Sequence, residues 1–283
     1  MRRPLVLAGL LPALPALLAL TSAGCHGRAP HLAGEAHGLA VETRTVLLGA
    51  TEIALVVHTT ETTEPTFVVL HTDEQPAVDR GLEAIRARGG RLVEVRGQGD
   101  RLVNFELAGR TWRFDPNRIF TAAGAAASLA AYNDSAPGDV LAAALTEVQR
   151  FADAVLDATD AGSLPVLVAL HNNTEDFYSA ASYAPGGDLA GDAAAVYLPP
   201  DQDPDDFFFV TDRGLFEALA AEGFSTILQD NARAQDDGSL SVWAGRRGQA
   251  YVNVEAQMEH TEQQARMLEA LARVLVEAGQ IPK

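Results

Sequence analysis

Two histidines and one glutamate stand where apolar runs of the sequence end, and their spacing suits a metal site. His71 closes the run at 65–71, and Glu74 follows it by three positions. A tight turn can bring an imidazole and a carboxylate at this spacing onto one ion. His171 closes a second apolar run, at 162–171, and offers a third ligand. Zinc suits such a mixture of nitrogen and oxygen ligands, with water in the remaining position. Taken singly, a histidine at the end of a buried strand is more often a structural residue.

Two further stretches carry side chains that could act on a substrate. The segment at 114–121 places Asp115, Asn117 and Arg118 within four positions, and by itself it is a polar turn that contains an arginine. Glu255 lies in the run at 249–256, which is otherwise typical of a buried strand. A buried carboxylate without a partner is costly, so a catalytic role competes with that of a strand carboxylate on a solvent face.

In this order the motifs resemble the carboxypeptidase A-type zinc peptidases, a family that includes the desuccinylase and aspartoacylase kinds of deacylase. The family pattern runs His-x-x-Glu, then Asp-x-Asn-Arg with an aromatic residue soon after, then a strand-terminal His, then a Glu on a late strand. The sequence matches it at His71-x-x-Glu74, at Asp115-Pro-Asn117-Arg118 with Phe120, at His171 and at Glu255. The resemblance covers roughly residues 50–277 and implies a zinc carboxypeptidase-like fold.

The resemblance also implies roles for the metal-side residues. His71, Glu74 and His171 would be the zinc ligands. Asp115 would hold His71 in its metal-binding tautomer. Glu255 would be the general base that takes a proton from the activated water and passes it to the leaving nitrogen.

Substrate contacts are expected from two further stretches. By the same resemblance, Asn117 and Arg118 would bind a substrate carboxylate, for which a guanidinium fork is geometrically suited. The segment that follows His171 is rich in side-chain hydrogen-bonding groups. From it we expect Asn172, Asn173 and Tyr178 to line the pocket.

Two departures from the family pattern concern other substrate contacts. Where the family carries a mobile tyrosine, this sequence has Gly245, followed by Arg246 and Arg247. Arg246 is a candidate reader of a second anionic group, and the alternative is a pair of exposed hairpin arginines. The family's upstream transition-state arginine has three candidate counterparts, namely Arg101, Arg110 and Arg113.

The amino terminus is typical of an export signal rather than of a folded segment. Arg2 and Arg3 precede an apolar run to residue 20, and small residues then lead to Cys25, the single cysteine of the chain. This ending resembles a bacterial lipoprotein signal, so we expect residues 1–25 to be the signal with a lipidated Cys25. The alternative is an ordinary signal peptide cut nearby. Residues 26–40 would form a flexible tether to one catalytic domain at 41–283.

Charge limits the classes of partner. The formal net charge of the 283 residues is -17, and removal of residues 1–24 would take away two arginines and no acid. So acidic a chain, with no basic stripe, is not expected to bind nucleic acid. Membrane contact is expected through the N-terminal lipid only.

Strands alternate with helices along the chain, and some neighbouring strands are joined by hairpins too short for a parallel crossover. These patterns predict an α/β fold with a mixed, mostly parallel twisted sheet flanked by helices. A long segment of little periodicity, 172–205, is predicted as a functional loop. The predicted strands are 43–49, 52–60, 65–71, 91–97, 101–107, 110–115, 162–171, 206–211, 224–229, 240–244 and 249–256, and the predicted helices are 76–88, 138–161, 212–222 and 260–277.

Three functions fit these expectations. The first is a lipid-anchored hydrolase of the bacterial cell envelope that uses Zn²⁺ to cleave an amide bond beside a free carboxylate, in a small peptide or a peptidoglycan stem peptide. The second is a deacylase of N-acyl amino acids. The third is a surface lipoprotein that binds a ligand without turnover. Metal content separates the enzymes from the binding protein, and activity on acyl-amino acids but not on peptides separates the two enzymes.

Overall fold

The structure is a computed structural model that describes residues 39–175 and 178–281. The predicted signal segment, Cys25 and the tether up to residue 38 therefore lie outside the described residues. Leu39 is buried and the first strand begins at Ala40. Within the described ranges, no helix is both long and apolar enough to cross a bilayer.

A large mixed sheet forms the centre of the described part of the chain. Its nine strands there are β1 (Ala40–Leu48), β2 (Thr51–Thr59), β3 (Thr66–Val69), β4 (Arg91–Arg96), β7 (Val166–Asn173), β8 (Ala193–Tyr197), β9 (Phe207–Val210), β10 (Thr226–Gln229) and β11 (Ala250–Gln257). They lie in the order β1-β2-β4-β3-β7-β11-β9-β10-β8. The run β4-β3-β7-β11 and the pair β9-β10 are parallel, and the other pairings are antiparallel. The mixed sheet is confirmed, with its parallel strands concentrated at the centre.

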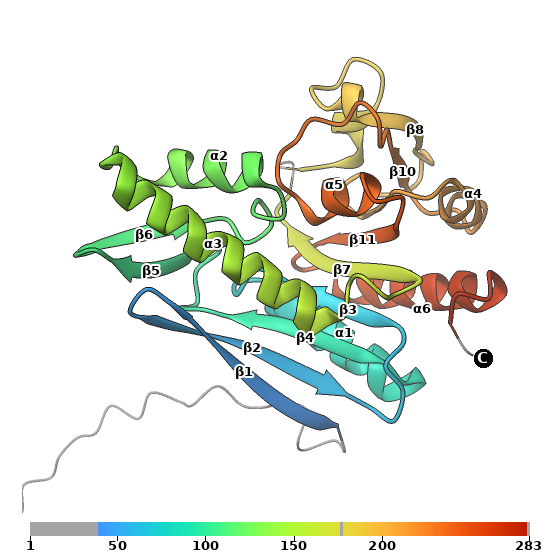
Figure 1. The fold of residues 1–283 in the computed structure, drawn as a ribbon. Helices are drawn as coiled ribbons and strands as arrows, with labels where there is room; N and C mark the ends of the chain where they lie inside the picture. Colours follow the sequence, from blue (N-terminus) through green and yellow to red (C-terminus); the bar gives the residue numbers. More distant parts are fainter. Residues whose placement is uncertain (1–38, 176–177, 282–283) are drawn as a thin grey trace, which may run out of the picture. The chain divides into compact units, whose positions relative to one another are not determined.

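Helices cover both faces of this sheet (Figure 1). One hydrophobic core lies under α2 (Ala122–Tyr132), α3 (Gly138–Thr159) and α5 (Leu240–Gly245). The other lies under α1 (Gln75–Arg88), α4 (Arg213–Ala221) and α6 (Thr261–Glu277). A separate hairpin, β5 (Val103–Leu107) with β6 (Arg110–Phe114), packs its aromatic side chains into the first core. This layering confirms the predicted α/β class.

Strand β3 shows why the central strands are apolar along their whole length. Its four residues are all buried, because helices cover both faces of a parallel sheet. Helix α1 then begins at Gln75 with a proline in its first turn and ends at Gly89, whose φ of 88° suits glycine. These bounds agree with the predicted helix at 76–88.

Three local predictions differ from the structure. The segment predicted as a strand at 240–244 is helix α5, because the Ser239 side chain caps its first turn by accepting a hydrogen bond from the Val242 N–H. Strand β8 lies inside the predicted loop at 172–205, together with two short 3₁₀ turns, η2 (Ala180–Tyr183) and η3 (Ala190–Asp192). Helix α2 was not predicted, since its alanine-rich sequence has little amphipathic pattern.

The turn after β6 is held by a close backbone contact with the segment before α5. Gly238 has a φ of +79°, and a Cβ there would lie 2.4 Å from the Arg118 carbonyl oxygen and 2.6 Å from the Gly124 Cα. The Gly238 carbonyl also accepts a hydrogen bond of 2.9 Å from the Phe120 N–H. Only glycine fits this contact, which fixes the position of the 114–121 segment.

We therefore expect Gly238→Ala to destabilise the fold more than Gly109→Ala. Gly109 has a similar φ of +75°, but a Cβ there would meet no atom within 4 Å, so it carries only the left-handed backbone cost of about 1–2 kcal/mol. At Gly238 the overlap with two backbones adds roughly 1–3 kcal/mol to the loss in free energy of unfolding. Urea denaturation of both variants measures the difference, and equal losses would contradict the assigned contact.

Candidate active site

Three adjacent parallel strands gather the candidate residues at one edge of the sheet. The carboxyl ends of β3, β7 and β11 lie side by side there, the position where open α/β sheets bind ligands. His71 follows β3 by two residues, and His171 lies within β7. Glu255 on β11 pairs in register with His171, so the two side chains leave the sheet on the same face.

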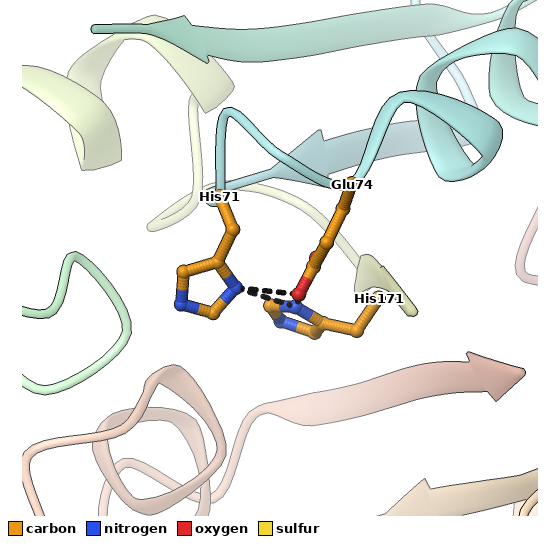
Figure 2. Close-up of side chains that lie close together, drawn as sticks. All are labelled: His71, Glu74 and His171. Carbon is orange, nitrogen blue, oxygen red and sulfur yellow. Dashed lines mark hydrogen bonds and ion pairs between the residues drawn. The ribbon is translucent and has the colours of Figure 1, made fainter. Parts of the chain in front are cut away.

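The predicted ligands His71, Glu74 and His171 converge on one point (Figure 2). A turn from His71 brings Glu74 to the N-cap of α1, with the Glu74 N–H 3.3 Å from the His71 carbonyl oxygen. The Glu74 carboxylate contacts the Nδ1 atoms of His71 at 2.8 Å and of His171 at 2.9 Å. These two Nδ1 atoms are 3.3 Å apart. All three residues are at most 3% exposed.

The donor atoms fit a metal ion. Two nitrogen ligands on a tetrahedral zinc are about 3.3–3.4 Å apart, given Zn–N distances of about 2.0–2.1 Å. The separation of the two Nδ1 atoms matches this value. Two imidazoles and one carboxylate form a ligand set of open, catalytic zinc sites. The group is therefore compatible with a metal ion.

Asp115 completes the support of His71. Its Oδ1 lies 2.9 Å from the His71 Nε2, on the far side of the ring from Glu74. The carboxylate is itself held by the Asn117 N–H at 2.8 Å, and the Asp115 N–H donates to Ser128 at 2.9 Å. A proton on Nε2 leaves the Nδ1 lone pair free to face the ligand group.

The charges around His71 favour a cation at this point. Burial by itself lowers the pKa of His71, but the Glu74 charge and the hydrogen bonds with Asp115 and Glu74 outweigh it and raise the pKa to about 9. Burial acts to raise the pKa of Glu74, but the charges and hydrogen bonds of His71 and His171 hold it well below its usual range. The site thus keeps a carboxylate charged in the interior by placing positive charge beside it.

Glu255 is a buried carboxylate in an environment unlike that of Glu74. Burial raises its pKa to about 7, and the Glu74 charge adds to this rise, while His171 and a hydrogen bond from Asn253 oppose it. The Asn253 Nδ2 donates to Oε2 at 2.9 Å. A carboxyl group poised near neutral pH suits a general base.

One cavity of about 430 Å³ contains these groups, a size that suits a small ligand. It is lined by the ligand group and by polar and aromatic side chains from several loops and strands. The lining includes His71, Asp73, Glu74, Arg101, Asn117, Arg118, His171, Asn172, Asn173, Thr174, Tyr178, Tyr183, Asp192, Phe209, Gln229, Asp237, Ser241, Tyr251, Asn253 and Glu255.

Asn117 and Arg118 lie on the cavity wall as predicted. The Asn117 Nδ2 is 3.4 Å from the His171 Nε2, and its Oδ1 accepts a hydrogen bond from the Leu240 N–H at 3.2 Å. The Arg118 Nη1 donates to the Asn117 carbonyl oxygen at 2.8 Å and lies 3.6 Å from the Asp237 carboxylate. The chain therefore places a carboxylate of its own beside the predicted carboxylate reader, and no sequence pattern pointed to Asp237.

The polar residues after His171 have different positions. Both halves of the Asn172 amide are engaged, because its Oδ1 accepts from the Ala77 N–H and its Nδ2 donates to the Ala256 carbonyl oxygen and to Gln264. Asn172 thus ties β7 to α1, β11 and α6, and it also lines the cavity.

Asn173 and Tyr178 both line the cavity. The Tyr178 hydroxyl hydrogen-bonds the Tyr183 hydroxyl at 2.6 Å, and its ring packs against Phe207 with centroids 5.4 Å apart. Tyr183 lines the cavity as well, and the sequence analysis did not single it out.

The structure does not bring Arg246 to the site. Its side chain is half-exposed and pairs with Asp236 at 2.6 Å, outside the cavity. Gly245 is buried, and a Cβ there would lie 2.5 Å from both the Asn231 and the Gln229 side chains. The segment is the end of helix α5 rather than a hairpin, and Arg246 follows the helix as an exposed residue, as in the alternative interpretation.

Of the three candidate transition-state arginines, Arg101 is the one placed at the site. Its Nη1 donates to the Glu74 Oε1 at 2.9 Å from the cavity wall. Arg110 stacks over Trp112, with 4.6 Å between its guanidinium carbon and the ring centroid. Arg113 is exposed on β6.

No family model matches the sequence. No curated protein matches it either. Similar solved structures include a metallo-carboxypeptidase from Burkholderia cenocepacia, with 13% identity and a TM-score of 0.43 over 86% of this chain and 65% of that one. An aspartoacylase family protein from Mesorhizobium loti has 12% identity and a TM-score of 0.41, over 87% of this chain and 68% of that one. A murein-tripeptide amidase from Escherichia coli O157 has 17% identity and a TM-score of 0.42, over 84% of this chain and 91% of that one.

The chain thus spans just under two thirds of the Burkholderia metallo-carboxypeptidase. At this level of identity, function has to be inferred from the side chains of the site itself.

We expect metal binding to depend on the His-Glu-His group. Purified wild-type protein should hold about one zinc per chain, and His71→Ala or Glu74→Gln should hold none after dialysis. Asp115→Asn should bind zinc ten- to hundredfold more weakly, because the orientation of His71 is lost. Metal analysis and chelator competition measure this, with Asp237→Asn as a control carboxylate of the same cavity. A wild-type protein that takes up no metal would contradict the assignment.

The raised pKa of Glu255 predicts a pH-dependent stability of the metal-free protein. A carboxyl group with a pKa of about 7 when folded and about 4.5 when unfolded stabilises the fold below pH 4.5 and loses that contribution as pH rises through 7. Glu255→Gln removes this dependence, so its advantage over wild type should grow by about 2–3 kcal/mol between pH 5 and pH 8. Urea unfolding at both pH values measures it, and a constant difference would mean that the pKa is not raised.

Proposed function

We propose that this chain is a zinc-dependent amide hydrolase, a divergent member of the carboxypeptidase, amidase and deacylase superfamily that its motifs resemble. One observation supports this more than any other. The buried Glu255 carboxylate lies in register with His171, in the same cavity as a His-Glu-His group with metal-site spacing. The site thus combines a metal-type ligand set with a separate carboxyl group that no ligand role occupies.

The residues divide the chemistry among them. When bound, zinc would polarise the substrate carbonyl and lower the pKa of a coordinated water towards ~7. Glu255 takes the proton of the attacking water and delivers it to the leaving nitrogen, so that the C–N bond breaks and a carboxylic acid and an amine result. Arg101 lies where its charge can stabilise negative charge on the carbonyl oxygen.

Arg118 supports a substrate with a free carboxylate beside the cleaved bond. Its guanidinium lies on the cavity wall, and its neighbour Asp237 is a carboxylate at 3.6 Å in a loose, half-exposed pair. A substrate carboxylate would compete with Asp237 for this guanidinium. Peptides with a free carboxyl end, including peptidoglycan stem peptides, have the group that such a site requires.

The proposed setting is the bacterial cell envelope, with the domain attached through a lipid on Cys25. The support is the sequence alone, since the apolar run, the small residues and the single cysteine all lie outside the described residues.

Glu255→Ala tests the proposal. We expect the variant to keep its zinc and to lose turnover by about a hundredfold or more, because the proton shuttle is gone. The assay uses zinc-loaded protein with peptides that carry a free or an amidated carboxyl end and with N-acyl amino acids. Glu259→Ala, an exposed glutamate beyond the same strand, is the matched control.

Loss of zinc in Glu255→Ala would make that residue a ligand, and unchanged turnover would remove it from the chemistry. Cleavage of acyl-amino acids but not of peptides would identify a deacylase. A wild-type protein that binds zinc and cleaves neither would leave the proposed function without support.

A further inference from the structure

We propose that the cavity binds substrates with a hydrogen-bond donor on each side of the cleaved bond, read by the side-chain carbonyl oxygens of Asn253 and Asn173. The inference rests on the proposed function for the position of the cleaved bond. It names a substrate class for the same site and two residues that select it.

Both oxygens are buried and have no hydrogen-bond partner among the described residues. Asn173 and Asn253 are each 8% exposed, and both line the cavity. Buried polar atoms are almost always paired, so two unpaired acceptors in side chains that line one cavity indicate atoms that a bound ligand would pair.

The orientation of each amide is fixed by its other half. The Asn253 Nδ2 donates to the Glu255 Oε2 at 2.9 Å. The Asn173 Nδ2 donates to the carbonyl oxygens of Tyr178 and Asp205, at 3.1 and 2.7 Å. The two carbonyl oxygens and the ionised Glu255 carboxylate accept hydrogen bonds, and a flipped amide would turn its oxygen against them. Each Oδ1 therefore points away from them as an acceptor.

The sheet register places the two acceptors on opposite sides of the catalytic level. Along the parallel pair of β11 and β7, Asn253 is opposite Ala169, Glu255 is opposite His171, and Gln257 is opposite Asn173. Residues two apart on a strand share a face, so Asn253, Glu255, His171 and Asn173 all project towards the cavity. The two asparagines are four strand positions apart, about 13 Å at 3.3 Å per residue. A substrate cleaved at the level of Glu255 and His171 would extend towards one asparagine on each side.

The chemical class of the substrate follows from the hydrogen-bond donor that each oxygen lacks. An N–H or O–H group of the substrate satisfies it, whereas a methyl or methylene group in the same place leaves it buried and unpaired. A site with unpaired acceptors discriminates strongly against a substrate whose side chain is apolar. An apolar pocket discriminates less strongly against a polar side chain of the same shape. We expect side chains that end in an amide, an ammonium or a hydroxyl to be favoured, and the substrate series separates these three.

The test crosses two variants with two substrate pairs. Each pair differs on one side of the amide bond only, with a glutamine side chain in one member and its near-isostere methionine in the other. Lysine and serine versions rank the donors. Zinc-loaded wild type should favour the donor in both pairs by about tenfold or more in kcat/KM. Asn253→Leu should abolish the preference in one pair and Asn173→Leu in the other, so that each variant is the control for the other.

The preference is the ratio of the kcat/KM values of the two substrates of a pair, both measured with the same variant. A general effect of the Asn253 substitution on Glu255, or of the Asn173 substitution on the loop that Asn173 holds, therefore cancels. Should Asn173→Leu fail to fold, Asn173→Ser replaces it. No donor preference in wild type, or two variants that change both pairs equally, would overturn the inference.

Binding to zinc-loaded Glu255→Gln, whose side-chain carbonyl oxygen can still accept the hydrogen bond from the Asn253 Nδ2, separates this inference from the proposed function. Calorimetry with the same compounds measures selectivity without turnover. Donor-selective binding with no hydrolysis by wild type would support the two acceptors and remove the hydrolase. Hydrolysis with equal binding of donor and isostere, or with no measurable binding of either, would support the hydrolase and overturn the acceptor roles.

Discussion

The site depends on one buried carboxylate. Glu74 is 1% exposed, and an ionised carboxylate in such a place is unstable unless positive charge and hydrogen bonds surround it. His71, His171 and Arg101 provide them, at 2.8, 2.9 and 2.9 Å. A metal ion would meet the same demand with the same donor atoms. Neutralisation of Glu74 therefore depends on residues from the ends of β3 and β7 and from the loop that carries Arg101, all of which contact its carboxylate.

The same cavity holds a second buried carboxylate in the opposite electrostatic state. Glu74 has a pKa well below its usual range, while burial raises that of Glu255 to about 7. The difference comes from the neighbours, since Glu74 contacts two imidazoles and a guanidinium, whereas Glu255 accepts its hydrogen bond from a neutral amide, that of Asn253. Two carboxylates held apart in this way can serve as ligand and base without exchanging roles.

The scaffold fixes these groups through strand pairing, a close backbone contact and the side-chain amide of Asn172. Parallel pairing of β3, β7 and β11 places His171 directly beside Glu255 on the neighbouring strand. The close approach of Gly238 to the Arg118 backbone fixes the part of the cavity wall that carries Arg118. Asn172 ties β7 to α1, β11 and α6 from within the sheet edge. The ligand group thus lies at the end of β7 and on the turn between β3 and α1, while the rest of the cavity wall combines strand residues with loops.

Short-range chemistry was readable from the sequence itself. His71 and Glu74 interact within one turn, and apolar runs identified β3, β7 and β11, so the ligand group, its edge of the sheet and the α/β class could be predicted. The position of Asn253 beside Glu255 could also have been predicted, since Asn253 precedes Glu255 by two residues and shares its strand face. Only the tertiary structure placed Asp237 beside Arg118, turned Arg246 outward on α5 and left the Asn173 and Asn253 oxygens unpaired among the residues described. Asp237 and Arg118 meet from segments far apart in the sequence, where local pattern does not determine which side chains come into contact.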